Sequence, residues 1–356
     1  MKKIMLFFSL VLTAAGFAFD QEQRPIVDLR GTWKFEIGDS MKFADPNFND
    51  SKWDNIFVPE VWENEGYPGY DGFAWYRKKF VLPLSAKGKK LHFNAGFIDD
   101  ACSIYINGRL IGGKGFFPPR FETAYDQEED FVLPPEYVKF NQENVVAIRV
   151  YDDYKFGGIT RGKIGVFSHA DDIETVVALP DLWKFKTGDE EQWSSPSFDD
   201  RKWSDLIVPT PWDYQGYGEY DGFGWYRVSF TIPSSLHNEK LFIFLGKIDD
   251  VDETYFNGLK IGNTGRIGGS RWKERISEEY QIVRVYRIPE TAIKYNQKNT
   301  LALRVYDKMK FGGICEGPVG IVTEKEYRNW LRQQPRSGSE FKNNFEKLLD
   351  KIFDEN

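Results

Sequence analysis

Short segments with alternating apolar and polar positions dominate the pattern along this chain. In VVAIRV at residues 145–150 and in TLALRV at residues 300–305, every second side chain is apolar. A period of two residues is typical of a β-strand that buries one face. Similar segments recur between Asn-Gly, Gly-Gly and Pro turns, and no long helical pattern interrupts them before residue 324. The pattern predicts an all-β protein made of β-sandwiches.

The chain also contains one long sequence twice. GYPGYDGFAWYRKKF at residues 66–80 matches GYGEYDGFGWYRVSF at residues 216–230, with an offset of 150 residues. After Gly115 the offset grows to 155, so the second copy carries a five-residue insertion. A surface loop tolerates such an insertion, whereas a core strand does not. A match of this length at a nearly fixed period predicts two homologous domains.

The repeat divides the chain into four predicted parts. Lys2 and Lys3 precede an apolar run that ends at Phe19, which is typical of a secretory signal peptide. The run is too short to predict a transmembrane helix. We therefore expect an exported protein, periplasmic or secreted, without a membrane span. The parts are a signal peptide (1–18), a first domain (19–170), a second domain (171–323) and a C-terminal tail (324–356).

The C-terminal tail has a different pattern from the two domains. Its apolar residues fall at helical spacing, which predicts a short amphipathic helix. Two roles are open for this helix: it docks on the second domain, or it mediates self-association or binding to a protein partner. The apolar residues are Phe341, Phe345, Leu348, Leu349, Ile352 and Phe353.

The charge of the chain narrows the classes of partner. The formal net charge is -7, and it becomes about -9 when Lys2 and Lys3 leave with the signal peptide. A negative protein repels phosphate backbones and anionic lipid surfaces. Nucleic acid is therefore not an expected partner.

Four motifs occur in the same order in both copies: a Trp-rich start, a YDG..WYR block, an IDD......NG segment and an RVYD....GGI segment. In this order they resemble the jelly-roll, galactose-binding-like domain at the N-terminus of family 2 glycoside hydrolases of the β-galactosidase and β-glucuronidase type. In that family a separate TIM barrel carries both catalytic carboxylates, and a barrel needs ~250 residues. Only 33 residues follow the second copy. The resemblance implies a binding domain without the catalytic barrel, so no enzyme activity is expected.

These features predict non-catalytic carbohydrate binding, with one shallow site in each sandwich. The alternative is a structural or scaffolding protein whose jelly rolls and C-terminal helix contact other proteins. A glycoside hydrolase or a carbohydrate esterase is the least favoured function. The esterase signal is the GDS sequence at residues 38–40, and the second copy has Glu190 in place of Ser40.

The resemblance implies that the loop before the GGI segment points toward the sugar. The matching carboxylates are Asp152 and Asp153 in the first copy and Asp307 in the second. Carboxylates suit this role because they accept strong, charge-assisted hydrogen bonds from hydroxyl groups. The alternative is a repeated structural ion pair, in which Arg77 neutralises Asp152 and Arg227 neutralises Asp307.

Aromatic and acidic residues of the YDG..WYR block form a second candidate wall of each site. An aromatic face can stack on a sugar ring, but a large ring also buries ~150 to 250 Å² in a core. Both roles are open for Trp75 and Trp225, whereas core burial is predicted for Trp33, Trp53, Trp183 and Trp203. The candidate ligand-binding residues are Tyr70, Asp71, Trp75, Arg77, Asp152 and Asp153 in the first domain, and Tyr220, Asp221, Trp225, Arg227 and Asp307 in the second.

Each copy also contains a pair of adjacent acids, Asp99 with Asp100 and Asp249 with Asp250. Neighbouring strand residues point to opposite faces, so these carboxylates are not expected to converge as a catalytic pair. Turn and backbone hydrogen bonding is the predicted role. No cofactor is expected, although a structural calcium ion is compatible with acid-rich loops because carboxylates and carbonyls are its ligands.

Overall fold

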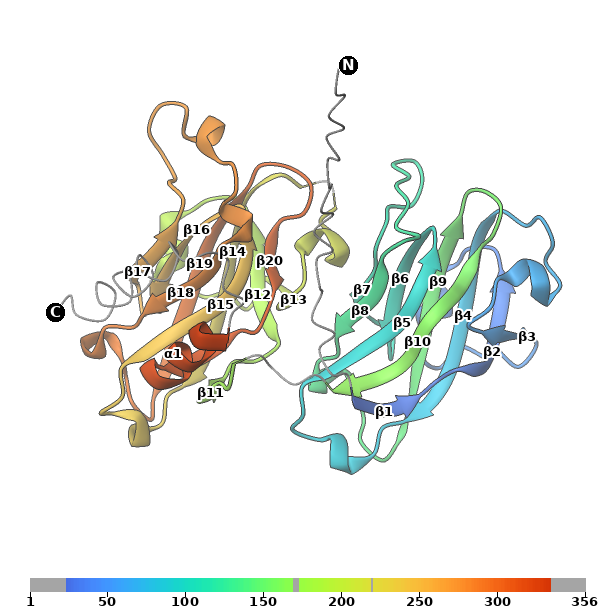
Figure 1. The fold of residues 1–356 in the computed structure, drawn as a ribbon, viewed down its shortest axis with the longest axis horizontal. Helices are drawn as coiled ribbons and strands as arrows, with labels where there is room; N and C mark the ends of the chain where they lie inside the picture. Colours follow the sequence, from blue (N-terminus) through green and yellow to red (C-terminus); the bar gives the residue numbers. More distant parts are fainter. Residues whose placement is uncertain (1–23, 169–172, 219, 334–356) are drawn as a thin grey trace, which may run out of the picture.

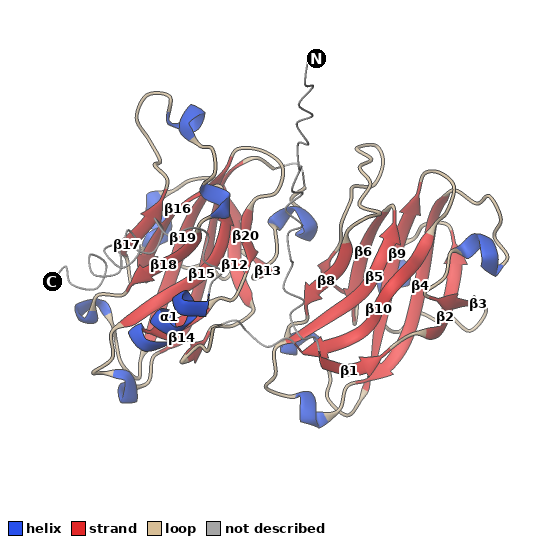
Figure 2. Cartoon of the chain, viewed as in Figure 1, coloured by secondary structure: helices blue, strands red, loops and turns tan. Residues whose placement is uncertain are grey.

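The computed structural model describes residues 24–168, 173–218 and 220–333, and these residues form mostly β-strands (Figures 1 and 2). Two β-sandwiches lie side by side, each made of two antiparallel sheets (Figure 1). The prediction of an all-β fold is confirmed. The predicted signal peptide and the predicted domain boundary at residue 170 lie outside the described residues.

The first sandwich packs a four-stranded sheet, in the order β1-β10-β5-β8, against a six-stranded sheet, in the order β3-β2-β4-β9-β6-β7. Its strands are β1 (Arg24–Asp28), β2 (Gly31–Ile37), β3 (Asp54–Val58), β4 (Gly72–Val81), β5 (Leu91–Asp99), β6 (Ala101–Ile106), β7 (Arg109–Gly112), β8 (Glu128–Val132), β9 (Glu143–Asp152) and β10 (Gly158–Ser168).

The second sandwich repeats this arrangement. One sheet has the order β11-β21-β15-β18, with β20 also paired to β15, and the other has the order β13-β12-β14-β19-β16-β17. Its strands are β11 (Val177–Ala178), β12 (Leu182–Thr187), β13 (Ser204–Ile207), β14 (Gly222–Thr231), β15 (Leu241–Asp249), β16 (Val251–Phe256), β17 (Leu259–Thr264), β18 (Val283–Arg287), β19 (Lys298–Asp307), β20 (Gly313–Glu316) and β21 (Gly320–Thr323).

Helical structure in the described residues is confined to connections and to the end of the second sandwich. The α-helix α1 spans Glu324–Gln333. The 3-10 helices are η1 (Met41–Ala44), η2 (Trp62–Glu65), η3 (Leu84–Ala86), η4 (Pro135–Tyr137), η5 (Glu191–Ser194), η6 (Trp212–Gln215), η7 (Ser234–Leu236), η8 (Trp272–Arg275), η9 (Glu279–Gln281) and η10 (Glu290–Ala292).

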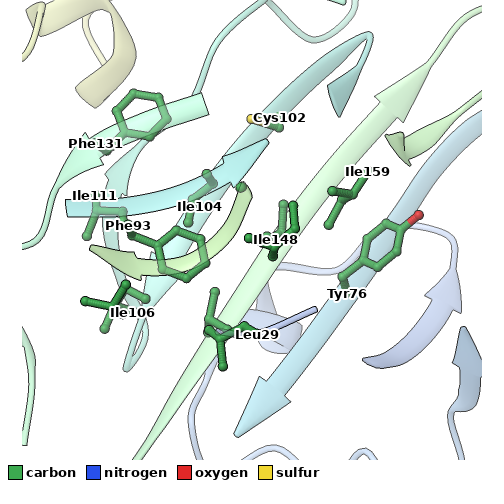
Figure 3. Close-up of a cluster of buried hydrophobic side chains, with 14 of the residues drawn as sticks. Leu29, Tyr76, Phe93, Cys102, Ile104, Ile106, Ile111, Phe131, Ile148 and Ile159 are labelled. Carbon is green, nitrogen blue, oxygen red and sulfur yellow. The ribbon is translucent and has the colours of Figure 1, made fainter. Parts of the chain in front are cut away.

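Each sandwich has its own hydrophobic core between its sheets. In the first, the inward-facing positions of the strands supply side chains such as Phe93, Ile104 and Ile148, which Figure 3 shows packed together. The period-two pattern of the sequence is the cause, because alternate strand residues point to one face. The predicted core tryptophans are all buried: Trp33, Trp53, Trp183 and Trp203.

The GGI segment of each copy brings the backbone close to a buried tryptophan. A Cβ atom at Gly157 would lie 2.1 Å from the Trp62 ring, and one at Gly312 would lie 2.3 Å from the Trp212 ring. Side chains cannot approach this closely, so only glycine fits at both positions. These contacts fix the course of the loops that follow β9 and β19.

The helix α1 docks on the second sandwich. Tyr327 and Trp330 pack against a small core cluster that includes Phe242, Phe244 and Val322. The Phe244 and Trp330 rings are 5.0 Å apart between centroids. All six apolar residues of the predicted amphipathic helix, from Phe341 to Phe353, lie outside the described residues, so that helix stays a prediction. Within the described ranges, no helix has the length and apolar character needed to cross a membrane.

Candidate functional site

Three carboxylates converge at one end of each sandwich. In the first, Asp99 ends β5, Asp100 lies in the turn to β6, and Asp152 ends β9. One oxygen from each of these side chains lies within 4.8 Å of the other two. We call Asp99, Asp100 and Asp152 the first triad. Asp249, Asp250 and Asp307 form the second triad with the same geometry.

The convergence of the adjacent acids corrects the sequence prediction. The rule that neighbours point to opposite faces applies to extended strands, whereas Asp100 lies in a bend where the chain passes from one sheet to the other. The predicted backbone hydrogen bonding is present as well. The amide of Asp153 donates to Asp100 Oδ2 at 3.0 Å, and that of Lys308 donates to Asp250 Oδ2 at 2.9 Å.

The aspartates at the ends of β9 and β19 are buried without a countercharge. Asp152 and Asp307 are both fully shielded from solvent. Among the described residues, neither carboxylate oxygen of Asp152 has a hydrogen-bond partner, and Asp307 accepts only the Met309 amide, at 3.0 Å, on one oxygen. In the parts of the chain that the structure describes, no salt bridge involves either residue.

The predicted alternative, an ion pair between Asp152 and Arg77, is therefore wrong. Arg77 Nε instead donates to Asp50 Oδ2 at 2.8 Å, and the equivalent Arg227 donates to Asp200 Oδ2 at 2.8 Å. Both arginines are buried on the opposite face of the sheet from the core. Arg77 and Arg227 thus belong to structural ion pairs with other partners, and the structure separates them from the triads.

Burial changes the protonation of the triads. Loss of solvation raises the pKa of Asp152 to about 7, and the nearby carboxylates of Asp100, Asp99 and Asp71 add to the effect. The backbone N–H of Tyr154 points its positive end toward Asp152 and lowers the pKa of that carboxyl, which offsets part of this rise, although it does not complete a hydrogen bond. Burial likewise raises the pKa of Asp307 to about 7. Desolvation and the adjacent carboxylate also raise the pKa of Asp99 and Asp249.

These raised pKa values predict that stability depends on pH. In the unfolded chain an aspartate titrates near ~3.9, so the folded protein binds more protons between about pH 4 and pH 7. The stabilisation is complete below the unfolded pKa and is lost as the pH rises through 7. We expect the unfolding free energy of chelator-treated protein to fall by roughly 2 kcal/mol for each of Asp152 and Asp307 between pH 5 and pH 8.

Urea denaturation at these two pH values, in the presence of a chelator, measures this dependence. The double variant Asp152→Asn, Asp307→Asn should show a flatter dependence, because an amide does not titrate. Equal slopes for the variant and the parent protein would contradict the assignment to these two residues.

The predicted aromatic wall lies inside the structure instead of facing solvent. Trp75 and Trp225 are fully buried. Trp75 stacks on Tyr105, with 5.8 Å between ring centroids, and its indole N–H donates to Asp39 Oδ1 at 3.2 Å. Since protein side chains cover these rings, their faces are not open to a sugar.

The other predicted residues of the YDG..WYR blocks and the adjacent loop are half-buried or exposed. Tyr70 is half-buried, and its hydroxyl donates to the Phe73 carbonyl at 2.7 Å; Tyr220 donates to Phe223 in the same way, at 2.6 Å. Asp71, Asp153 and Asp221 have exposed side chains. Asp71 is close enough to Asp152 to affect its pKa. The remaining predicted residues that gather at the first triad are thus Asp71, Asp152 and Asp153.

The Asp39 of the GDS sequence also has a structural role. Its carboxylate pairs with Arg149, with 2.7 Å between Nε and Oδ1. The second copy repeats the pair between Asp189 and Arg304, again at 2.7 Å. This ion pair, whose carboxylate also accepts the indole N–H of Trp75 in the first domain and of Trp225 in the second, explains why both copies contain the sequence GD.

Exposed aromatic side chains around the first triad were missed by the sequence analysis. Tyr125, Tyr154 and Phe156 are exposed by 54%, 68% and 57%. Tyr125 lies two residues after Thr123, whose hydroxyl donates to Asp100, and Tyr154 directly follows Asp153, whose amide donates to Asp100. A comparison of the two copies could have found them. Met309 and the half-buried Phe311 of the second copy stand at the positions of Tyr154 and Phe156, so the pair of exposed aromatic rings is specific to the first domain.

A cavity of about 710 Å³ lies between the two sandwiches. The first sandwich lines it with residues that include Phe131, and the second with residues that include Tyr214, Phe311 and Asp249 of the second triad. The Phe131 and Tyr214 rings are 6.3 Å apart between centroids, and Arg120 of the first domain donates to the Gly218 carbonyl at 2.7 Å. The second triad therefore borders the contact between domains, whereas the first triad does not line this cavity.

The fold defines a tandem of two all-β sandwich domains, each with a carboxylate triad at one end. The sequence matches the family model described as the β-galactosidase second all-beta domain twice, at residues 38–154 and 188–310. The chain belongs to this family. The matches fall in the all-β domains, and the predicted resemblance to accessory domains of family 2 glycoside hydrolases is confirmed.

Individual relatives match over short regions. A β-glucuronidase of Formosa agariphila is 30% identical over 146 residues, which is 37% of this chain and 14% of the relative. A β-galactosidase of Bacteroides ovatus is 30% identical over 139 residues, which is 35% of this chain and 15% of the relative. The chain thus spans 14% and 15% of the length of these two relatives.

Solved structures of related enzymes have a weaker similarity. The structure of a Lactobacillus rhamnosus β-glucuronidase is similar with a TM-score of 0.36 and 14% sequence identity, over 85% of this chain and 44% of that chain.

Proposed function

We propose that this protein is an exported, non-catalytic carbohydrate-binding protein whose main site lies over the first triad. The observation that carries the proposal is the group of exposed aromatic side chains, Tyr125, Tyr154 and Phe156, on the loops that border this triad. The names of the matched relatives refer to glucuronides and galactosides, which supports a carbohydrate as the ligand class.

The chemistry of this surface suits a sugar. Aromatic rings offer flat apolar faces to the C–H groups of a pyranose, and exposed large rings on a soluble protein mark binding surfaces when they gather. Asp71 and Asp153 stand beside them with exposed carboxylates that can accept hydroxyl hydrogen bonds. The site is shallow, so it binds without enclosing the ligand.

The second domain offers a poorer surface for the same ligand. Met309 replaces Tyr154, Lys308 replaces Asp153, and Phe311 contacts Tyr214 with 5.2 Å between ring centroids. The second triad is also next to the contact between domains. We therefore expect the first domain to supply most of the affinity.

A glycan-array screen of residues 19–356, followed by calorimetry on the best ligand, tests this function. The double variant Tyr154→Ala, Phe156→Ala should weaken binding at least about fivefold, because each lost ring contributes roughly 0.5 to 1.5 kcal/mol. Its unfolding free energy should stay within ~0.5 kcal/mol of the parent, since both side chains are exposed.

Met309→Ala is the matched control, because it removes the equivalent exposed side chain of the second domain and should leave affinity unchanged. Binding that is lost in the control and kept in the double variant would move the site to the second domain. No binding to any glycan would instead favour a scaffolding protein.

A further inference from the structure

We propose that each triad is a binding site for a divalent cation of the Ca²⁺ class, so that the chain holds two such ions. This inference concerns the floor of the candidate site and does not depend on sugar binding. It is carried by the same arrangement in both domains: three converging carboxylates, of which the one at the end of β9 or β19 is completely buried with at least one oxygen that has no hydrogen-bond partner among the described residues.

The spacing of the carboxylates fits a calcium ion. Calcium takes six to eight oxygen ligands at ~2.3 to 2.6 Å, so two ligands on opposite sides of the ion are separated by up to about 5 Å. The oxygens of Asp99, Asp100 and Asp152 lie within 4.8 Å of one another, as do those of the second triad. One ion can therefore contact all three carboxylates of a triad, and the rest of its ligands are water or ligand hydroxyls.

The buried aspartates give an independent reason for a cation. A carboxylate taken out of water is strongly unfavourable unless it is paired or binds a metal. Within the part of the chain that the structure describes, both oxygens of Asp152 and one oxygen of Asp307 are buried without a hydrogen-bond partner. The oxygens face other carboxylates, so hydrogen bonding inside a fully ionised triad does not satisfy them.

The basic groups nearest to the triads are engaged elsewhere. The Arg161 guanidinium lies over the Phe97 ring, 4.1 Å from its centroid, and its charge has only a minor effect at Asp99. Arg284 pairs with the Asp252 carboxylate at 3.1 Å and donates to the backbone carbonyl of Asp250 at 2.6 Å, and its charge has only a minor effect at Asp249. These groups do not neutralise the three carboxylates of a triad.

The donor set also favours calcium over other divalent cations. All donors are carboxylate oxygens, which suit hard cations and not zinc, which prefers nitrogen and sulfur ligands. Magnesium is usually held by one or two carboxylates and keeps several waters, whereas each triad offers three carboxylates. The amide of Asp153 or Lys308 holds one oxygen of each turn aspartate, which orients that side chain before an ion arrives.

Isothermal titration of CaCl₂ into chelator-stripped protein, residues 19–356, tests the inference. The parent protein should bind two Ca²⁺ ions per chain, and MgCl₂ should bind more weakly. Asp152→Asn and Asp307→Asn should each leave one ion, and the double variant should bind none. Asp199→Asn is the control, because this acid is exposed and belongs to neither triad, and the variant should still bind two ions.

Thermal denaturation provides a second measurement. Saturating CaCl₂ should raise the Tm of the parent protein by roughly 5 °C and that of the double variant by none. The absence of Ca²⁺ binding by the parent at ~1 mM, within the range of weak extracellular calcium sites, would overturn the proposal. So would a stoichiometry that neither single variant changes. A negative glycan array leaves both measurements intact, so failure of sugar binding is distinguishable from failure of the cation sites.

Discussion

The Asp252→Ala variant is expected to lose about 3 to 5 kcal/mol of unfolding free energy in the second domain, because it leaves the Arg284 guanidinium buried without its carboxylate. The two side chains are both completely buried, and Arg284 Nε lies 3.1 Å from Asp252 Oδ1. Tyr286 and Thr254 also donate hydroxyl hydrogen bonds to Asp252, at 2.9 and 3.0 Å. The variant therefore removes the hydrogen-bond acceptor of three buried or half-buried side chains, Arg284, Tyr286 and Thr254, at once.

The first domain shows that the fold does not need this ion pair. At the positions of Asp252 and Arg284 it has Cys102 and Glu129, both buried. Burial raises the pKa of Glu129 to about 7, with the Lys114 charge opposing that change. The two domains thus fill one pair of positions with different chemistry, and the cost of breaking the pair is specific to the second domain.

Urea denaturation followed by tryptophan fluorescence measures this effect. The double variant Asp252→Ala, Arg284→Met should recover part of the loss, because it removes both charges, and the double-mutant cycle gives the coupling energy. Asp199→Ala is the control, since it breaks an exposed pair with Arg201 and should cost less than ~1 kcal/mol. A loss at Asp252→Ala no larger than that of the control would contradict the buried-pair assignment.

The Arg77→Met variant is the second substitution with a large expected effect, again a loss of about 3 to 5 kcal/mol. Arg77 lies on β4 and is completely buried. Besides pairing with Asp50, its guanidinium donates to the carbonyls of Phe43, Asp45 and Phe48. This one side chain therefore anchors the connection between β2 and β3 to the sheet, and methionine replaces its volume but none of its hydrogen bonds.

The second copy and the same strand provide the comparisons for Arg77→Met. Arg227→Met should have a similar effect, because Arg227 pairs with Asp200 and donates to the Trp193 carbonyl. Lys79→Met should change stability by less than ~0.5 kcal/mol, because Lys79 is an exposed residue of β4 that pairs with an exposed Glu143. Loss of glycan or Ca²⁺ binding by Arg77→Met without loss of stability would show that Arg77 belongs to the site after all.

The sequence by itself determined the class of fold. The alternation in segments such as 145–150 and the long repeat are local properties of the chain, and each strand buries its apolar face wherever that strand is placed. The same reasoning correctly placed Trp33 and Trp183 in the core. It also predicted a helix in the C-terminal tail, but the apolar residues behind that prediction begin at Phe341 and lie outside the described residues, whereas α1 spans Glu324–Gln333.

The tertiary structure alone decided which polar side chains meet. Arg77 pairs with Asp50, 27 residues away, and not with Asp152, because η1 and the loop after it fold back over β4. Trp75 was open to two roles, and the packing of Phe43 and Tyr105 against it decided for burial. Strand patterns fix which face a side chain takes but do not specify which distant segment covers that face.

The triads show most clearly which features the sequence predicts and which only the tertiary structure determines. Asp99 and Asp100 are neighbours in sequence, yet Asp152 joins them from a strand about fifty residues later. The turn between β5 and β6 changes sheets, so the period-two rule no longer applies there. The sequence supplied the carboxylates in both copies, and only the pairing of β9 with β4 and β6 brought them to one point, because register between distant strands is a property of the whole packed sandwich.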